Sequence, residues 1–237
     1  MAQGYVRPAR PGEAGEIARI QLETWRVAYR RILPRHVLDQ LDAGWMAQRW
    51  RAAVEHPPSA RHRVLVAVEQ AGPAYLVGFA AAGPADEAAL APGESLADWG
   101  RAPDRRPGDA RDDGDARDDR GDTRDDRGDA RDDRGDAPDG WSDRVVAVTD
   151  LLVEPRWGRR GHGSRLLAAC AAHWAADGFD RAVAWAFRED VATRRFLTSA
   201  GWAPDGAARA LDVADLLVPQ LRLHVRIGDP DGPEPGR

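Results

Sequence analysis

Residues 145–175 carry the strongest structural signal in this chain. They read VVAVTDLLVEPRWGRRGHGSRLLAACAAHWA: an apolar run, a turn rich in Arg and Gly, and an amphipathic stretch. Apolar residues in the last part recur at helical spacing, so one face of a helix can pack on a sheet. The segment predicts a buried strand over 145–153 and a helix over 163–177, joined by a tight turn.

The turn has the composition of an anion-binding loop. Gly161 and Gly163 allow a tight backbone turn and close approach of a ligand. The helix that follows presents unpaired N–H groups and its positive dipole end, and Arg159 and Arg160 add charge. His162 is expected to face solvent, with a phosphate contact as the alternative. Because the chain has no lysine and no third glycine here, a Walker A loop is excluded and a dinucleotide fingerprint is disfavoured, which leaves a phosphate site or a purely structural turn.

Hydrophobic patterning predicts further elements on both sides of this segment. The predicted strands are residues 5–9, 63–69, 75–81, 181–187 and 221–227. The predicted helices are residues 12–31, 34–55 and 190–200. Strands come first and then alternate with helices, which indicates an α/β fold with a mixed central sheet and helices on both faces. In such a sheet, ligands bind where neighbouring strands part at their C-terminal ends.

Residues 98–140 differ in kind from the rest. Near-identical copies of GDARDDR follow one another from Gly114, and no position of this repeat carries an apolar side chain larger than that of Ala. A segment with nothing to bury cannot offset the entropy lost on ordering, so we expect a disordered, acidic insertion within a single domain of residues 1–237. The insertion holds sixteen Asp and ten Arg, which leaves the remainder nearly neutral and gives no indication of nucleic-acid binding.

Composition and cysteine usage suggest a location. No apolar run approaches the ~20 residues that span a bilayer, and the N-terminus lacks a basic region followed by an apolar stretch. The single cysteine, Cys170, lies on the apolar face of the predicted helix and is expected to be a buried structural thiol. We therefore expect a cytoplasmic protein with no membrane, nucleic-acid or metal partner.

The segment LLVEPRWGRRGHGSRLLAA resembles the acetyl-CoA motif of the GNAT N-acetyltransferases. In that family, Gln/Arg-x-x-Gly-x-Gly/Ala follows a strand ending in Asp/Glu-Pro; here Glu154-Pro155 precedes Gly161-x-Gly163 at the family spacing. YVRPARPGEAGEIARIQLETWRVAYRRILP is similar to the family's first strand and helix, and REDVATRRFLTSAGWAPDG to a late helix. Five motifs in the family's order cover nearly the whole chain except the insertion, and the chain resembles an actinobacterial-type member.

This resemblance implies a GNAT fold with acetyl-CoA bound as co-substrate between the fourth and fifth strands. There, a backbone N–H of Leu152 or Val153 could polarise the acetyl carbonyl. Leu197 stands where many members have the Tyr that protonates the departing thiolate, and Trp185 where one branch has a Glu as general base. The residues assigned to cofactor binding are Leu151, Leu152, Val153, Arg159, Arg160, Gly161, His162, Gly163, Ser164 and Asp190.

Four carboxylates are candidates for the base that deprotonates an amine. We favour Asp150 as the catalytic residue, because it interrupts an otherwise apolar strand; an outward polar residue at a bulge is the alternative. Glu154 is expected to cap the strand end, and Asp190 to cap the helix that it begins, although Asp190 also stands where many members have an Asn that contacts pantetheine or acceptor. Glu189 is the fourth candidate.

Four aromatic residues belong to the predicted first two helices, which cover the acceptor site in the family. Trp25 and Tyr29 share a helix face and are assigned to substrate binding, with core packing as an equal alternative. Trp45 and Trp50 are expected to pack in the core.

The sequence thus predicts an N-acetyltransferase that transfers an acetyl group from acetyl-CoA to a primary amine of a small molecule or to a protein amino group. The chain could form a homodimer. One alternative is a non-catalytic acyl-CoA-binding sensor or regulatory module, since Leu197 and Trp185 replace two usual catalytic residues. Another is an interaction protein whose acidic repeat is the working part.

Overall fold

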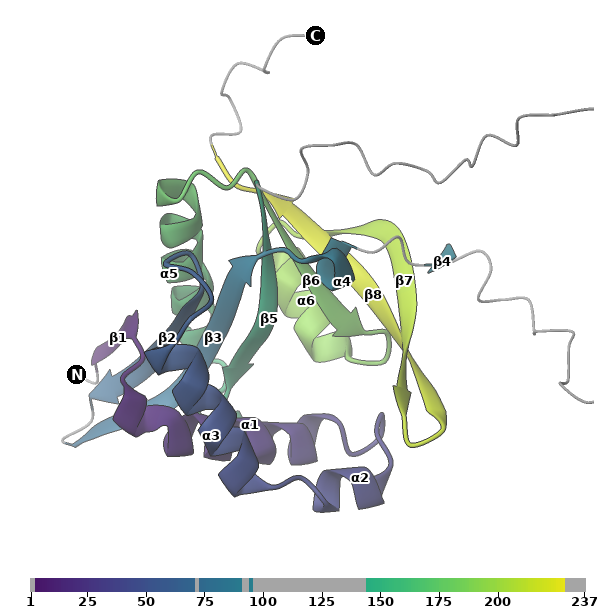
Figure 1. The fold of residues 1–237 in the computed structure, drawn as a ribbon, viewed down its shortest axis with the longest axis horizontal. Helices are drawn as coiled ribbons and strands as arrows, with labels where there is room; N and C mark the ends of the chain where they lie inside the picture. Colours follow the sequence, from purple (N-terminus) through teal and green to yellow (C-terminus); the bar gives the residue numbers. More distant parts are fainter. Residues whose placement is uncertain (1–2, 71–72, 91–93, 96–143, 229–237) are drawn as a thin grey trace, which may run out of the picture.

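The computed structural model describes residues 3–70, 73–90, 94–95 and 144–228. These residues form one sheet of eight strands in the order β1-β2-β3-β5-β6-β8-β7-β4 (Figure 1). The strands are β1 (Gln3–Pro8), β2 (Arg63–Gln70), β3 (Ala74–Pro84), β4 (Glu94–Ser95), β5 (Val145–Val153), β6 (Arg181–Phe187), β7 (Ala203–Val213) and β8 (Leu216–Arg226). Neighbouring strands are antiparallel except β5 and β6, which are parallel. The predicted mixed sheet is confirmed.

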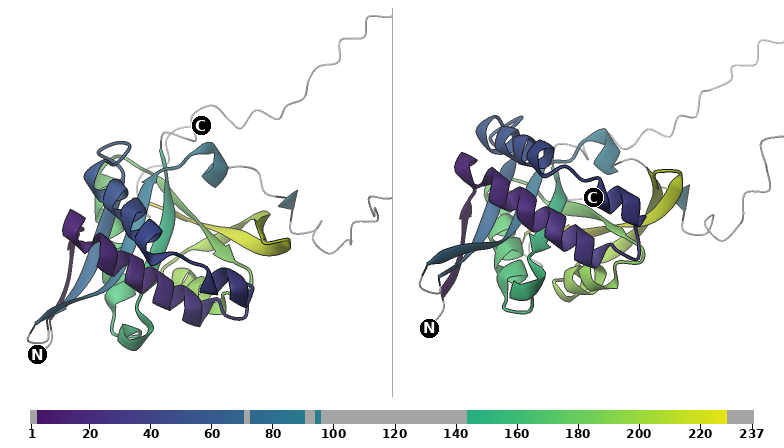
Figure 2. Two further views of the ribbon diagram at one scale, coloured as in Figure 1. Left: turned by 60° about the horizontal axis from the view of Figure 1, so that its bottom comes forward. Right: turned by 90° about the horizontal axis from the view of Figure 1, so that it is seen from below.

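Helices cover both faces of this sheet, as predicted (Figure 2). They are α1 (Ala14–Ala28), α2 (Arg35–Asp39), α3 (Ala43–Glu55), α4 (Glu87–Leu90), α5 (His162–Ala176) and α6 (Val191–Ser199). Helices α1 and α3 pack side by side on one face, and α5 and α6 pack on the other. The core beneath α1 consists of Ile17, Ile20, Val66, Val68, Phe79 and Leu152. None of the helices in the described ranges is long and apolar enough to cross a membrane.

Strands β5 and β6 pair only along their first parts. Their register ends where Val148 lies opposite Ala184, whereas β5 continues to Val153 and β6 to Phe187. On the other side of β5, the register with β3 shifts, so that Thr149 has no opposite residue and forms a bulge. The two strands therefore part at their C-terminal ends, where the sequence predicted a ligand.

Several element predictions are corrected by the structure. The boundaries of β5 and β6 match the predictions, but the single helix expected over 34–55 is two helices, because Asp42 caps α3 by accepting a hydrogen bond from the N–H of Trp45 at 2.8 Å. Strand β7 is not predicted, because APDGAARALDV is rich in residues depleted from strands; it forms by pairing with β8. The predicted insertion, residues 98–140, lies outside the described residues.

The expectation for Cys170 is confirmed. It is 4% exposed on α5, and burial raises the pKa of its thiol to about 12. The thiol therefore stays protonated at neutral pH, which makes it a packing residue and not a nucleophile.

Candidate active site

At the gap between β5 and β6, the backbone groups on one side of β5 have no neighbouring strand to pair with. The N–H of Glu154 donates to the carbonyl of Val77 on β3 at 2.8 Å. Backbone groups alternate sides along a strand, so the N–H of Leu152 also points toward β3, while those of Leu151 and Val153 point into the gap. Of the two groups expected to polarise a carbonyl oxygen, Val153 is the one that faces the gap.

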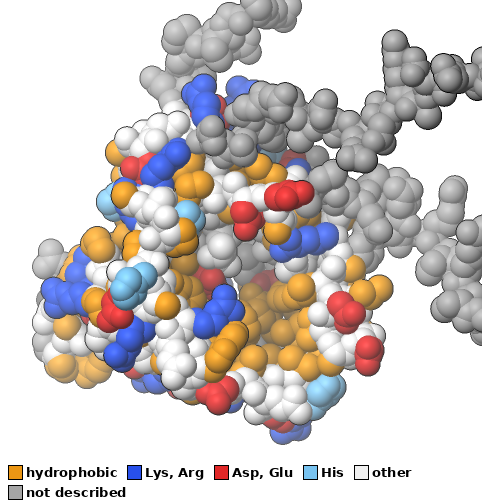
Figure 3. Space-filling model, in the orientation of Figure 1, with side chains coloured by type: hydrophobic (Ala, Val, Ile, Leu, Met, Phe, Trp, Pro, Cys, Tyr) orange, Lys and Arg blue, Asp and Glu red, His pale blue; other side chains and the backbone are white. Residues whose placement is uncertain are grey.

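A cleft of about 740 Å³ opens next to this gap, between the α1–α3 layer and the sheet. The indoles of Trp25, Trp45 and Trp50 line its helical side, and Asp150 lies on its strand side. Figure 3 shows that the molecule is hollowed on this side, with hydrophobic side chains at the bottom of the hollow. The volume falls within the roughly 300–1,000 Å³ of small-molecule pockets.

Asp150 is held in the cleft by a chain of hydrogen bonds from the helices. Gln21 donates from Nε2 to Oδ1 of Asp150 at 3.0 Å, and its Oε1 accepts a bond from Nε1 of Trp50 at 2.7 Å. Burial raises the pKa of Asp150 to about 6, although a hydrogen bond from Thr149, the charge of Arg49 and the bond from Gln21 act in the opposite direction. A carboxylate with this pKa is ionised at neutral pH and remains basic enough to accept a proton.

The other three candidate bases are occupied or lie elsewhere. Asp190 caps α6, as predicted: its carboxylate accepts bonds from the N–H of Thr193 at 3.0 Å and from the Thr193 hydroxyl at 2.6 Å. Glu189 is exposed in the turn before α6. Glu154 is 4% exposed and engaged in ion pairs. Of the four carboxylates, only Asp150 lines the cleft.

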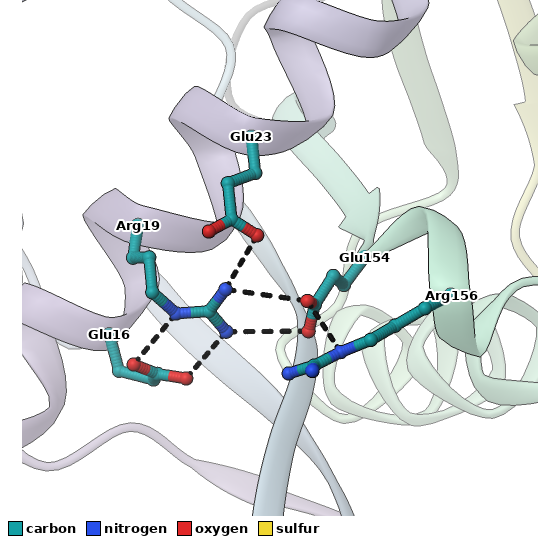
Figure 4. A network of polar contacts seen from close by, with 5 residues as sticks. All are labelled: Glu16, Arg19, Glu23, Glu154 and Arg156. Atoms are coloured by element: carbon teal, nitrogen blue, oxygen red, sulfur yellow. Dashed lines mark hydrogen bonds and ion pairs between the residues drawn. The ribbon is translucent and has the colours of Figure 1, made fainter.

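Figure 4 shows how Glu154 connects the end of β5 to α1. Arg19 on α1 lies 3.3 Å from Glu154 and also pairs with Glu16 and Glu23, each at 2.6 Å. Arg156 pairs with Glu154 from the opposite side at 2.6 Å. The ion pair with Arg19 fixes the end of β5 relative to α1, and Arg156 adds a second guanidinium to the buried carboxylate. Glu154 therefore links the end of β5 to the helix that carries Gln21.

The loop between β5 and α5 contains two residues in the left-handed region. Arg159 has φ 61° and Gly161, the N-cap of α5, has φ 80°. Left-handed residues in a turn gather N–H groups into an anion-binding concavity. The side chains of Arg159, Arg160 and Ser164 are exposed around it. These residues fit the pyrophosphate of a CoA thioester.

Gly163 keeps this loop close to α6. A Cβ on Gly163 would lie 3.3 Å from the ring of Phe196, tighter than an ordinary van der Waals contact. Nearby, the guanidinium of Arg160 lies 4.9 Å from the ring centroid of Trp157. Glycine at this position therefore has a packing reason in addition to ligand access.

The expectation that His162 faces solvent is wrong. Its side chain is 2% exposed, because it points from the start of α5 toward the sheet, where its ring meets the edge of Trp157 with centroids 6.3 Å apart. Its Nε2 lies 3.4 Å from a carboxylate oxygen of Glu69. Burial lowers the pKa of His162, with the charges of Arg165 and Arg160 acting in the same direction and Glu69 opposing them. Because the ring is buried, only the backbone of His162 is left for the predicted contact with a cofactor.

Trp25 and Tyr29 lie on one face of α1, as predicted, with ring centroids 6.1 Å apart. Trp25 lines the cleft, whereas Tyr29 packs edge-on against Phe187 at the end of β6, with centroids 4.9 Å apart. Burial raises the pKa of Tyr29, and the negative charges of Asp190 and Asp150 raise it further. Tyr29 thus places a protonated hydroxyl near the open ends of β5 and β6.

The two tryptophans of α3 behave differently. Trp45 is 56% exposed, so the expected core packing is wrong for it: it sits in the first turn of α3, on the rim of the cleft. Trp50 packs edge-on against Phe79 with centroids 4.9 Å apart, as expected, and also donates to Gln21.

The positions that depart from the family pattern have structural roles. Leu197 is 3% exposed in the core under α5 and α6. Trp185 donates from Nε1 to the carbonyl of Ala89 at 3.1 Å, and the guanidinium groups of Arg209 and Arg222 lie 4.3 and 5.5 Å from its ring centroid. Trp185 therefore anchors the end of α4 against β6.

Sequence reasoning missed Gln21 and Arg49. Gln21 is 5% exposed among the apolar residues that α1 buries, and a lone amide on an apolar helix face is a detectable signal of a buried polar partner. Arg49 lines the cleft from α3, but an arginine on an amphipathic helix gives no such signal. Within the described ranges, no group of three His, Cys, Asp or Glu side chains could hold a metal ion.

Comparisons with known proteins agree with this fold. The acetyltransferase (GNAT) family model matches residues 128–202. The PaiA N-acetyltransferase from Thermoplasma acidophilum, solved in complex with coenzyme A, superposes with a TM-score of 0.57 at 10% identity, over 94% of this chain and 99% of that one. The YncA protein from Salmonella typhimurium, solved with its cofactor acetyl-CoA, gives 0.55 at 14% identity, over 98% and 99%. Ard1 from Thermoplasma volcanium gives 0.54 at 13% identity, over 95% and 99%. A search of the curated proteins gave no match.

Proposed function

We propose that this chain, which has the fold of the GNAT acetyltransferases, transfers an acetyl group from acetyl-CoA to a primary amine. One observation carries the proposal: Asp150, whose pKa burial raises to about 6, lies in a cleft that adjoins the place where β5 and β6 part. A base at that point can take a proton from an amine facing the gap. Neighbours of the same fold were solved with coenzyme A or acetyl-CoA, which supports the choice of co-substrate.

Cofactor binding is proposed for the loop and the free edge of β5. Arg159, Arg160 and Ser164 are exposed around the start of α5, where N–H groups of the loop converge. Leu151 directs its N–H into the gap, where a carbonyl oxygen of a pantetheine amide would accept a hydrogen bond from it, and the N–H of Val153 is left for the acetyl group. The carboxylate of Asp190 is already used in capping α6, so any contact with the cofactor comes in addition to that role.

Acetyl-CoA supplies an acetyl group activated as a thioester. Asp150 accepts the proton that the amine loses as its nitrogen forms the new bond to the acetyl carbon, directly or through one water. The N–H of Val153 donates to the carbonyl oxygen on which charge develops. The carbon–sulfur bond breaks, and we propose that the hydroxyl of Tyr29 stabilises the departing thiolate by donating a hydrogen bond to the sulfur, which then takes its proton from solvent. The raised pKa of Tyr29 keeps the proton on that hydroxyl, so it acts as a hydrogen-bond donor and not as an acid.

The acceptor is proposed to be a small molecule. The cleft is enclosed by two helices and the sheet, and its volume of about 740 Å³ suits a small ligand. Trp25 supplies an aromatic wall close to Asp150. A protein amino group stays the second choice, and the cytoplasmic location, the homodimer and the actinobacterial type remain predictions from the sequence.

The alternative of a sensor module has one observation in its favour: Leu197 and Trp185 have no titratable group and serve packing, in the core and against α4, so neither can act as acid or base. A sensor would bind acetyl-CoA and leave it intact. Release of the CoA thiol, followed with a thiol-reactive dye across a broad panel of amines, separates the two functions. The buried Cys170 adds little background to such an assay, because its thiol stays protonated. Thiol release that depends on an amine supports the enzyme, and tight acetyl-CoA binding without any release supports the sensor.

A further inference from the structure

The charged groups that line the cleft differ in whether they already have partners. Arg63 forms a paired contact with Asp177 of the turn after α5. Asp86 accepts a bond from the N–H of Ala89 at 2.8 Å at the start of α4. Arg63 is therefore committed to the fold, and Asp86 holds the start of α4. The two charges that remain for a ligand are Asp150, the proposed base, which also accepts a bond from Gln21, and the guanidinium of Arg49.

Arg49 has the surroundings of a binding group. Within the described parts of the chain it makes no ion pair, and its guanidinium lies 4.9 Å from the ring centroid of Trp45. Stacking on an indole orients the planar fork and leaves its N–H edge free to donate. The charge of Arg49 also acts on Asp150, so the two groups share one cleft.

Resting on the proposed function, we propose that the acceptor is a zwitterion: a primary amine that also carries a carboxylate, as a free amino acid does. Its amino group would lie at Asp150, its carboxylate would accept two N–H bonds from Arg49, and its side chain would pack against Trp25 and Trp45. One cation and one anion at separate points of the cleft complement one anion and one cation on the ligand. A polyamine would bring a second positive charge toward Arg49, which like-charge repulsion disfavours.

Matched pairs of ligands test this directly on the full-length protein saturated with CoA. We would measure by calorimetry the dissociation constants of phenylalanine, tryptophan and leucine against phenethylamine, tryptamine and 3-methylbutylamine. Each pair differs only in the carboxylate. We expect at least one acid to bind about tenfold or more tightly than its decarboxylated partner, because a charge-assisted bond to Arg49 is lost in the amine.

Variants assign that preference to one side chain. Arg49→Gln should remove the difference within each pair, and Arg49→Lys should restore part of it. Arg51→Gln is the matched control, because Arg51 is an exposed arginine of the same helix that does not line the cleft; it should leave the difference unchanged. All three variants should bind acetyl-CoA as the unmodified protein does.

The outcomes separate this inference from the proposed function. Three results would overturn the proposal that the acceptor is a zwitterion: equal binding of acids and amines, no binding of any acid, or an equal effect of Arg49→Gln on both members of a pair. Thiol release with the decarboxylated amines alone would support the acetyltransferase activity and refute a zwitterionic acceptor. Carboxylate-dependent binding without thiol release would support a binding site for a zwitterion and refute the acetyltransferase activity.

Discussion

The amide of Gln21 donates to the carboxylate of Asp150 across 3.0 Å, and the indole of Trp50 holds that amide in place. The bond joins α1 to β5 at the bulge formed by Thr149. Because the amide donates, it favours the ionised carboxylate and opposes the effect of burial on its pKa. Gln21 therefore raises the fraction of Asp150 that is ionised, and so able to act as a base, near neutral pH.

Replacing Gln21 should move the pH dependence of turnover. Gln21→Met keeps the size of the side chain and removes the donor, so the pKa of Asp150 should rise above its value of about 6. Turnover depends on the ionised form, so it should fall several-fold at pH 6.5 and recover near pH 8.5. The rate profile of the variant against pH checks this, with the exposed Gln48→Met as control. A profile that superposes on that of the unmodified protein would contradict the role of Gln21.

Removing the hydroxyl of Tyr29 should slow catalysis without weakening binding. Tyr29→Phe keeps the ring contact with Phe187 and loses the hydrogen-bond donor proposed to stabilise the leaving thiolate. We expect kcat to fall about tenfold or more, with little change in the KM of the amine. Steady-state kinetics checks this, and Tyr5→Phe, on the exposed face of β1, serves as control. A change confined to KM would assign Tyr29 to substrate binding instead.

Side chains on the two loop glycines should abolish CoA binding. In the double variant Gly161→Leu/Gly163→Leu, the first side chain occupies a position with φ 80° and the second meets Phe196 and the concavity. The control Gly178→Leu imposes a left-handed residue of the same kind, φ 79°, after α5 with open space around it. Each left-handed leucine costs about 1–2 kcal/mol of stability, so both proteins should be destabilised. Calorimetry should show loss of CoA binding only in the double variant, and unchanged affinity there would refute the loop assignment.

Asp150→Asn should stabilise the fold above pH 6. The pKa of Asp150 is about 6 in the folded protein against 3.8 as its ordinary value, so the folded state binds the proton more tightly. The contribution of Asp150 to the free energy of unfolding is therefore complete below about pH 4 and is lost as the pH rises through 6. Asparagine has no such dependence and still accepts the bond from Gln21. The free energies of unfolding of the variant and the unmodified protein can be compared at each pH by denaturant unfolding. Between pH 4 and pH 8, the difference should shift in favour of the variant by up to about 3 kcal/mol. A constant difference across this range would show that Asp150 is not buried as a charge.

The sequence predicts the fold well where periodicity is strong. The boundaries of β5 and β6 are right because apolar runs between turn residues mark both strands. Strand β7 could not be predicted, since its stability comes from pairing with β8 and not from its own composition. Tertiary packing also decides the site: the direction of His162 depends on how α5 meets the sheet, and the exposure of Trp45 depends on where α3 begins.

The candidate site is predictable only in part for the same reason. A carboxylate in an apolar strand marks Asp150, and a Gly-x-Gly turn before a helix marks the loop. The partners that tune Asp150 come from α1 and α3, far earlier in the chain: Gln21 precedes Asp150 by 129 residues. No local pattern connects Gln21 or Arg49 to that strand, because the connection is made by the packing of both helices over the cleft.

Amine-dependent thiol release from acetyl-CoA decides whether Asp150 removes the proton from an amine held in the cleft. The variant to measure is Asp150→Asn, beside Asp86→Asn, which changes a carboxylate of the same cleft whose capping role asparagine can keep. We expect Asp150→Asn to lower turnover by about a hundredfold or more with unchanged acetyl-CoA affinity, whereas Asp86→Asn should stay close to the unmodified protein. Undiminished turnover in Asp150→Asn would show that Asp150 is not the base.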